Sequence, residues 1–246
     1  MPKSEETKTA RKAATDYAAD NLSKKVMDSR PVAFTLIKAS EFNQLLDRIE
    51  HPHLINQGRT EFCGPAAVLH ALAKDDPISY AKLAVGLFRE GKITVRGWTV
   101  DAGLLTTQQV PKDMEIDCCD WITMASIRTN IGFGSALSSV TTLVSGTLPW
   151  EIEQGLTSLG YAKVIDETSS TRFAKVDEAN LARASDLWTL QYRVILCIND
   201  NLFKDPNGTS WKPNHFCTLK SKVEMTDHIN CRVWQWGLSK KGTRHC

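Results

Sequence analysis

The residues that decide the fold run from Gln57 to Leu72 and read QGRTEFCGPAAVLHAL. Cys63 stands where a polar loop changes into an apolar run, and Gly64 and Pro65 follow it directly. Proline is tolerated in the first turn of a helix because its missing N–H would have no intrahelical partner there. The run therefore predicts a buried helix that begins at Cys63, where the positive end of the helix dipole favours a thiolate.

A second polar side chain precedes this helix. Gln57 lies six residues before Cys63, near enough for its side-chain amide to point toward the space above the sulfur. A thiolate attacks carbonyl groups, and an amide N–H can stabilise the oxyanion that such an attack creates. The pair predicts a nucleophile with an oxyanion donor.

Length and composition bound what the chain can be. It has 246 residues, of which 42% are hydrophobic and 24% are charged, and its formal net charge is +2. This composition predicts a globular protein, and the small net charge argues against a nucleic-acid partner. No apolar run approaches the ~18 residues that span a bilayer. The first 25 residues lack the apolar core of a signal peptide, so we expect a cytoplasmic protein or one delivered into the cytoplasm of a target cell.

Cysteine usage points to reduced thiols. The number of cysteines is odd and no signal peptide is visible, which favours free thiols in a reducing compartment. No CxxC pair is present, so we expect no metal site and no cofactor. The adjacent Cys118 and Cys119, between Asp117 and Asp120, are interpreted as small, partly buried thiols in preference to a metal or redox pair. The seven cysteines are Cys63, Cys118, Cys119, Cys197, Cys217, Cys231 and Cys246.

Patterning along the chain predicts helices first and an antiparallel sheet last. Residues 1–30 are polar and of mixed charge, typical of a mobile leader or linker, and residues 31–246 are predicted to form one domain. Helices are expected at 41–50, 63–74, 77–90, 117–131, 149–159 and 176–190. Strands are expected at 31–40, 161–165, 191–199, 215–220 and 231–237, with a strand or loop at 92–100. This order predicts an α+β fold.

A nucleophilic cysteine needs a base, and His215 is the candidate. It begins a predicted strand more than 150 residues after Cys63. A histidine at the start of a strand lies at the rim of a sheet, where a cleft would form.

Together these residues resemble the papain-like cysteine peptidases. The matching features are the six-residue spacing from Gln57 to Cys63, the Cys63-Gly64 pair and the later His215 strand. The run from Cys63 to Ala67 looks closest to the bacterial C39-like branch and to papain-like toxin effectors. The resemblance covers about 31–237 and implies an N-terminal helical part carrying the cysteine, with a C-terminal antiparallel sheet carrying the histidine.

The third member of the expected triad departs from the family pattern. The family uses Asn or Asp to orient the histidine, but the second half of the last predicted strand carries neither. If the turn of the hairpin lies near residue 225, position 235 is close to His215 across the hairpin. Gln235 could accept the Nδ1–H of His215 there, with Trp236 shielding the bond from water. Asn230 and Asp227 are the alternatives.

The resemblance implies a thiolate acyl-enzyme mechanism on a protein substrate. It also implies a toxin or effector domain used in competition between bacteria and neutralised by a cognate immunity protein. A glutamine deamidase with the same triad and a catalytically silent binding module are the alternatives. A cell-wall amidase would show an Asp-Cys-Ser-Gly motif, which is absent. Substrate specificity is expected in groove loops around Trp98, 132–147 and 202–213.

Overall fold

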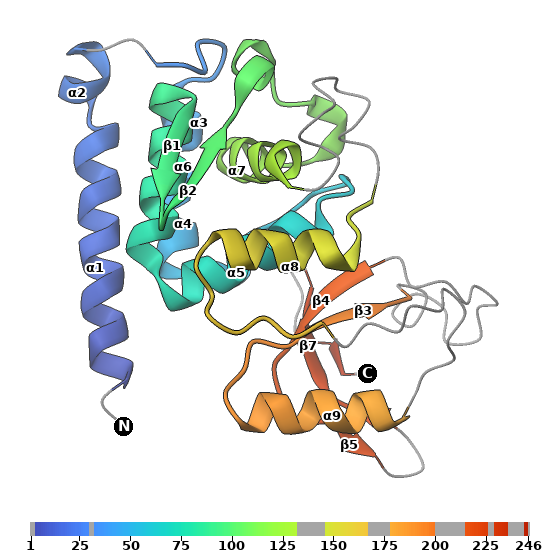
Figure 1. Ribbon diagram of the computed structural model, residues 1–246. Coiled ribbons are helices and arrows are strands. Elements are labelled where there is room, and N and C mark those ends of the chain that lie inside the picture. The colour runs from blue at the N-terminus through green and yellow to red at the C-terminus, as the bar shows by residue number, and fades with distance from the viewer. Residues whose placement is uncertain are drawn as a thin grey trace. The chain divides into compact units, whose positions relative to one another are not determined.

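The computed structural model shows a mixed α and β protein with small antiparallel sheets (Figure 1). The predicted α+β class is confirmed. Contacts divide the chain into two compact units, Met1–Val164 and Ile165–Cys246, each described by itself below; the division falls inside the stretch predicted as one domain. The structure describes residues 3–29, 32–131, 146–166, 178–199, 215–225, 229–235 and 244–245.

The first unit is mainly helical. Helix α5 packs against α6, α7 and α8, and its residues from Cys63 to Ala73 are all buried, as the apolar run after Cys63 predicted. The α-helices are α1 (Lys3–Leu22), α2 (Lys24–Ser29), α3 (Ala39–Phe42), α4 (Gln44–Glu50), α5 (Cys63–Asp75), α6 (Pro77–Glu90), α7 (Cys118–Asn130) and α8 (Pro149–Ser158). Short 3-10 helices are η1 (Pro52–Leu54), η2 (Gly103–Thr107) and η3 (Lys112–Met114).

Helix α6 has the bounds that its end signals predicted. The Asp76 side chain accepts a hydrogen bond from the backbone N–H of Ser79 at 3.1 Å, and Pro77 opens the helix. Gly91 ends it with φ of +70°, a conformation that glycine adopts without a steric penalty.

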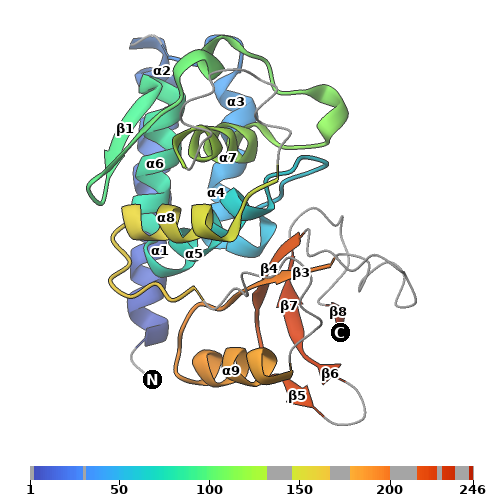
Figure 2. The same cartoon turned by 45° about the vertical axis from the view of Figure 1, so that its right-hand side comes forward.

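Helix α1 differs from the mobile leader predicted for residues 1–30. It packs along α6 and α4, on the outside of the first unit (Figures 1 and 2). Ala14 and Ala18, one turn apart, are fully buried, and Arg89 of α6 donates a hydrogen bond to Asn21 Oδ1 at 2.9 Å. Alanine contributes little apolar surface to a periodic pattern, yet its small side chain lets two helices approach closely, so the pattern understated this contact.

Three of the segments considered as strands differ in the structure. The strand or loop expected at 92–100 is a hairpin, with β1 (Lys92–Val95) paired antiparallel to β2 (Trp98–Asp101). The segments 32–40 and 161–165 do not form strands. In the first of these, the backbone N–H groups of Ala33 and Phe34 instead donate to carbonyl groups at the end of α6.

The second unit carries the larger sheet. Its strands have the order β3-β4-β7-β8, every neighbouring pair being antiparallel. Cys217, Leu219 and Val233 of this sheet belong to a hydrophobic core with Ala184 of α9. The elements are α9 (Glu178–Thr189), β3 (Ile195–Ile198), β4 (His215–Leu219), β7 (Arg232–Trp234) and β8 (Arg244–His245), with a separate hairpin of β5 (Glu224–Met225) and β6 (Ile229–Asn230).

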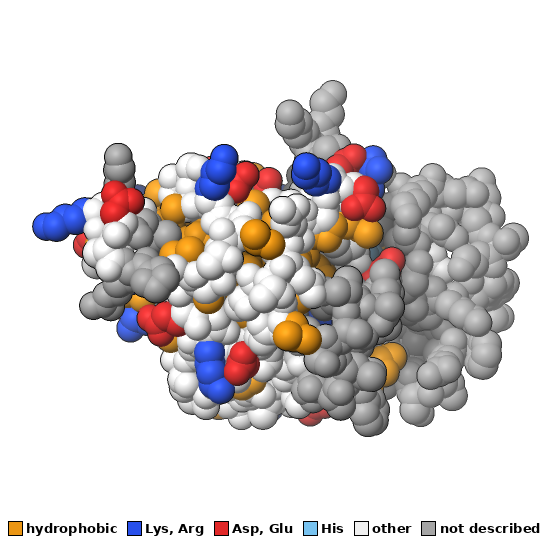
Figure 3. Space-filling model, turned by 90° about the horizontal axis from the view of Figure 1, so that it is seen from above, with side chains coloured by type: hydrophobic (Ala, Val, Ile, Leu, Met, Phe, Trp, Pro, Cys, Tyr) orange, Lys and Arg blue, Asp and Glu red, His pale blue; other side chains and the backbone are white. Residues whose placement is uncertain are grey.

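Within the described ranges, each helix is too short or too polar to cross a lipid bilayer. On the coloured part of the face shown in Figure 3, basic and acidic side chains lie interspersed.

Candidate active site

Cys63 is the first residue of α5, as predicted. Its side chain is 3% exposed, and the first turn of the helix contains no acidic residue. Gly64 follows it at a point of very close contact, since a Cβ there would lie 2.6 Å from Oγ1 of Thr147. The Cys-Gly pair is therefore required by packing, because a side chain at position 64 would displace Thr147 from the start of the helix.

A buried ion pair holds Thr147 in this place. Arg128 Nη1 lies 3.0 Å from Glu151 Oε1, and the two side chains are 5% and 3% exposed. The other oxygen of Glu151 accepts the backbone N–H of Leu148 at 2.7 Å. Thr147 lies at the edge of the predicted groove loop 132–147, of which residues 132–145 lie outside the described part of the chain. Its Oγ1 is buried and makes no hydrogen bond within the described residues.

Gln57 belongs to a tightly held loop in the same unit. Its carbonyl oxygen accepts hydrogen bonds from Thr60 through both the backbone N–H (3.2 Å) and Oγ1 (2.7 Å). Gly58 has φ of +59°, and a Cβ there would overlap the carbonyl oxygen of Met114. Arg59 donates its N–H to that same oxygen at 2.7 Å. The Gln57 side chain is half-buried, with Oε1 buried and without a hydrogen-bond partner in the described residues.

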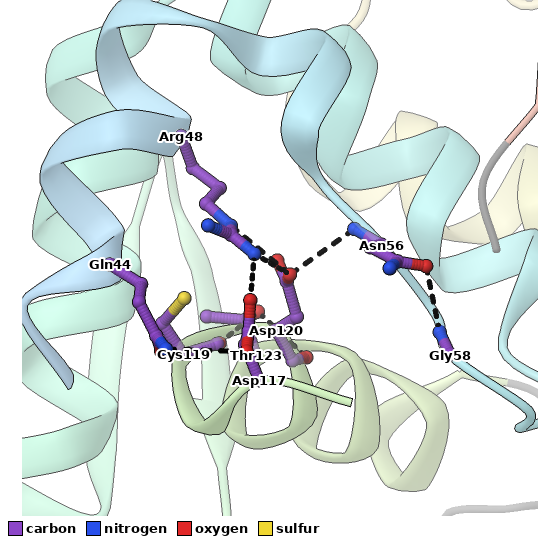
Figure 4. Close-up of polar contacts among 8 residues, drawn as sticks. All are labelled: Gln44, Arg48, Asn56, Gly58, Asp117, Cys119, Asp120 and Thr123. Carbon is purple, nitrogen blue, oxygen red and sulfur yellow. Dashed lines mark hydrogen bonds and ion pairs between the residues drawn. The ribbon is translucent and has the colours of Figure 1, made fainter. Parts of the chain in front are cut away.

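Behind this loop lies a polar network that sequence reasoning missed (Figure 4). Arg48 of α4 donates to Asp120 Oδ2 from Nε at 3.2 Å and from Nη2 at 3.0 Å, and it also pairs with Asp117. The same Oδ2 accepts the backbone N–H of Asn56 at 3.2 Å. Asn56 in turn accepts the N–H of Gly58 on Oδ1 at 2.9 Å. The network therefore connects α4 and α7 to the residues on both sides of Gln57.

Burial dominates the electrostatics of this network. Asp120 is fully buried, which raises its pKa to about 7, although Arg48 and the N–H of Asn56 counteract the shift. Burial alone would lower the pKa of Arg48, but attraction to Asp120 and Asp117 outweighs it and raises that pKa. Arg48 is therefore always charged, and Asp117 shares the task of neutralising it.

Cys118 and Cys119 are protonated at neutral pH. Burial, followed by the charges of Glu41 and Asp117, raises the pKa of Cys118 to about 11. Burial raises the pKa of Cys119 well above its usual range. Thiols in this state are poor nucleophiles and poor metal ligands. Across the described ranges, His, Cys, Asp and Glu side chains do not gather in groups of three that could hold a metal ion.

His215 lies in the second unit and begins β4, as predicted, with a half-buried side chain. The register pairs Thr218 with Trp234, and its continuation by one residue would set Gln235 opposite Cys217. Residues two apart on a strand share a face, so Gln235 lies on the same face as His215 but diagonally, two positions from the directly opposite site. Its predicted role as orienting residue stays a prediction.

Of the two alternatives to Gln235, the structure describes only Asn230. Asn230 is exposed and pairs with Glu224 in the β5–β6 hairpin. This hairpin follows the end of β4, whereas His215 lies at the start of β4. Asp227 and Trp236 lie outside the described residues, as does the predicted groove loop 202–213. Cys63 and Gln57 belong to the first unit and His215 to the second, so their pairing stays a prediction.

No protein-family model, no curated protein and no solved structure matches this chain. The resemblance to papain-like peptidases therefore depends on the residues and their spacing alone.

Proposed function

We propose that this chain is a cysteine peptidase of the papain-like type, acting on a protein substrate. Cys63 is the nucleophile, His215 the general base and Gln57 an oxyanion donor. The observation that carries the proposal is the start of α5. A cysteine occupies the first position of a buried 13-residue helix with no acidic residue in its first turn, and an anchored loop holds Gln57 six residues before it.

The proposed reaction is an acyl transfer in two steps. His215 takes the Cys63 proton, and the thiolate attacks the substrate carbonyl carbon. The backbone N–H of Cys63 and the amide of Gln57 stabilise the oxyanion; one such donor is worth ~3 kcal/mol. His215 then protonates the leaving amine as the C–N bond breaks, which leaves a thioester on Cys63. Water, deprotonated by His215, hydrolyses the thioester and regenerates the thiol.

Acylation by p-nitrophenyl acetate tests the chemistry without knowledge of the natural substrate. We expect a burst of p-nitrophenol and an acetyl group on Cys63, located by peptide mass spectrometry. Cys63→Ala should abolish the burst, and His215→Ala should slow it. Cys118→Ala is the matched control, because Cys118 also opens a helix, and it should leave the burst unchanged. An undiminished burst in Cys63→Ala would overturn the proposal.

The Cys63→Ala variant also separates peptidase from deamidase. Used as bait, it should retain a protein substrate and any inhibitory immunity protein. The captured substrate is then treated with the wild-type chain and its intact mass is measured. A peptidase divides the substrate into fragments. A deamidase leaves the substrate as one chain in which a glutamine side chain has become a carboxylate. That result would overturn the peptidase proposal in favour of a deamidase.

A further inference from the structure

We propose that Asp120 and Asn56 are positioning residues for Gln57, an inference that rests on the proposed function. In this role the buried carboxylate of α7 fixes the backbone of the loop, and the loop aims the Gln57 amide at the oxyanion. Arg48 completes the arrangement by holding Asp120 from the opposite side (Figure 4).

The hydrogen bonds converge on the two neighbours of Gln57. Asp120 Oδ2 accepts the N–H of Asn56, the residue before Gln57, at 3.2 Å. Asn56 Oδ1 accepts the N–H of Gly58, the residue after Gln57, at 2.9 Å. The backbone N–H groups of the residues before and after Gln57 are thus each bonded to a side chain, and one of those side chains, Asp120, is fully buried.

The loop cannot relax easily once these bonds are made. Gly58 has a left-handed backbone conformation and lies against the carbonyl groups of Met114 and Glu115. The carbonyl of Gln57 is occupied by Thr60. The backbone of Gln57 is therefore held on both sides, and only its side-chain torsions remain adjustable. Pre-positioning of an oxyanion donor lowers the barrier, because little reorganisation is then needed during the reaction.

The second acidic residue makes a clean test possible. Arg48 also pairs with Asp117, so loss of the Asp120 charge leaves the buried guanidinium with one carboxylate partner. Asp120→Asn keeps an oxygen that can accept the N–H of Asn56, whereas Asp120→Ala removes it. The Oδ1 of Asp120, where the new NH₂ group would lie, has no hydrogen-bond partner among the described residues.

The experiment is a double-mutant cycle on the acylation of Cys63 by p-nitrophenyl acetate. Asp120→Ala and Asn56→Ala should each lower the acylation rate constant about tenfold with KM unchanged. Asp120→Asn should retain most of the rate. In a Gln57→Ala background, neither alanine substitution should lower the rate further, because the group that they position is gone.

A control variant separates positioning from general loss of stability. Leu83 of α6 is fully buried, and Leu83→Ala should destabilise the unit by roughly 2–5 kcal/mol. It should leave the acylation rate of the folded protein unchanged. If Asp120→Ala does not fold, Asn56→Ala carries the test alone.

The outcomes for this inference and for the proposed function are distinct. Full additivity of Asp120→Ala or Asn56→Ala with Gln57→Ala would overturn the positioning role while leaving a cysteine hydrolase intact. Absence of acylation at wild-type Cys63 would overturn the proposed function. Amide hydrogen exchange tests the loop independently of any activity. Exchange at the N–H groups of Asn56 and Gly58 should be faster in Asp120→Ala than in the wild type, and unchanged exchange would overturn the inference.

Discussion

Helices α5 and α7 both begin with a cysteine, but their first turns differ in charge. Each is 13 residues long, and each has a cysteine as its first residue, Cys63 in α5 and Cys118 in α7. Cys63 is followed by Gly-Pro and has no acidic residue in the first turn. Cys118 is preceded by Asp117 and followed within the turn by Asp120.

The difference shows that a helix dipole does not by itself make a reactive cysteine. Both thiols lie at a positive helix end, yet burial, followed by the nearby charges of Glu41 and Asp117, raises the pKa of Cys118 to about 11. Cys63 is also buried, so what distinguishes it is that the first turn of α5 contains no acidic residue. At α7 the acidic residues bind Arg48 and the loop before Cys63 instead. One helix start carries the proposed nucleophile, and the other bonds the loop that carries Gln57, the proposed oxyanion donor.

The largest expected contrast is in alkylation by iodoacetamide at neutral pH. We expect Cys63 to react at least about 10³-fold faster than Cys118, because only a trace of Cys118 is thiolate at that pH. Peptide mass spectrometry measures both rates in one sample, with Cys118 as the internal reference. His215→Ala should reduce the contrast. Equal alkylation rates at Cys63 and Cys118 would contradict the expected difference in reactivity between the two helix starts.

The next effect is at Gln57. Gln57→Ala should lower kcat for ester hydrolysis by about 10²-fold with KM unchanged, because an oxyanion donor acts only in the transition state. Gln109→Ala, an exposed glutamine in the same unit, should have no effect. A rise in KM at constant kcat would mean that Gln57 binds the substrate and does not stabilise the oxyanion.

The start of α5 and both ends of α6 could be predicted from the sequence, since each depends on neighbouring residues. Cys63-Gly64-Pro65 marks the start of α5, and Asp76 with Gly91 marks the ends of α6. The β1–β2 hairpin was not predicted, because Arg96 takes a positive φ of 53° at its turn, where glycine or asparagine would be the usual signal.

The contacts that the sequence could not predict join residues that are far apart in the chain. Arg48 and Asp120 are 72 residues apart, so no periodicity relates them. The signal that existed was the pair Asp117 and Asp120, three residues apart and hence on one helix face, beside cysteines interpreted only as small thiols. The pairing of Cys63 with His215 also depends on residues far apart in the sequence, and the two residues belong to separate units. It therefore stays a prediction.

The second residues of the two helices offer a smaller test. In α5 it is Gly64, pressed against Thr147, whereas in α7 it is the fully buried Cys119. Gly64→Ala should destabilise the first unit by roughly 1–3 kcal/mol, because the Arg128–Glu151 pair keeps Thr147 from moving away. Adding Thr147→Ala should recover part of this loss in urea unfolding. A neutral Gly64→Ala would show that the start of α5 is no more tightly packed than that of α7.

The smallest expected effect is the pH dependence contributed by Asp120. Its folded-state pKa of about 7 lies above the value of 3.8 for an ordinary aspartate, so between these values the folded chain binds more protons than the unfolded chain. The stability from this group is fully present below pH 4 and is lost as the pH rises through 7. The wild type should therefore gain about 1 kcal/mol of unfolding free energy relative to Asp120→Asn between pH 8 and pH 6. Urea unfolding of both proteins measures the difference, and histidine titrations, common to both, cancel. A stability difference between the two proteins that does not change between pH 8 and pH 6 would mean that Arg48 keeps Asp120 ionised throughout, so that the start of α7 holds the Gln57 loop with a permanent charge.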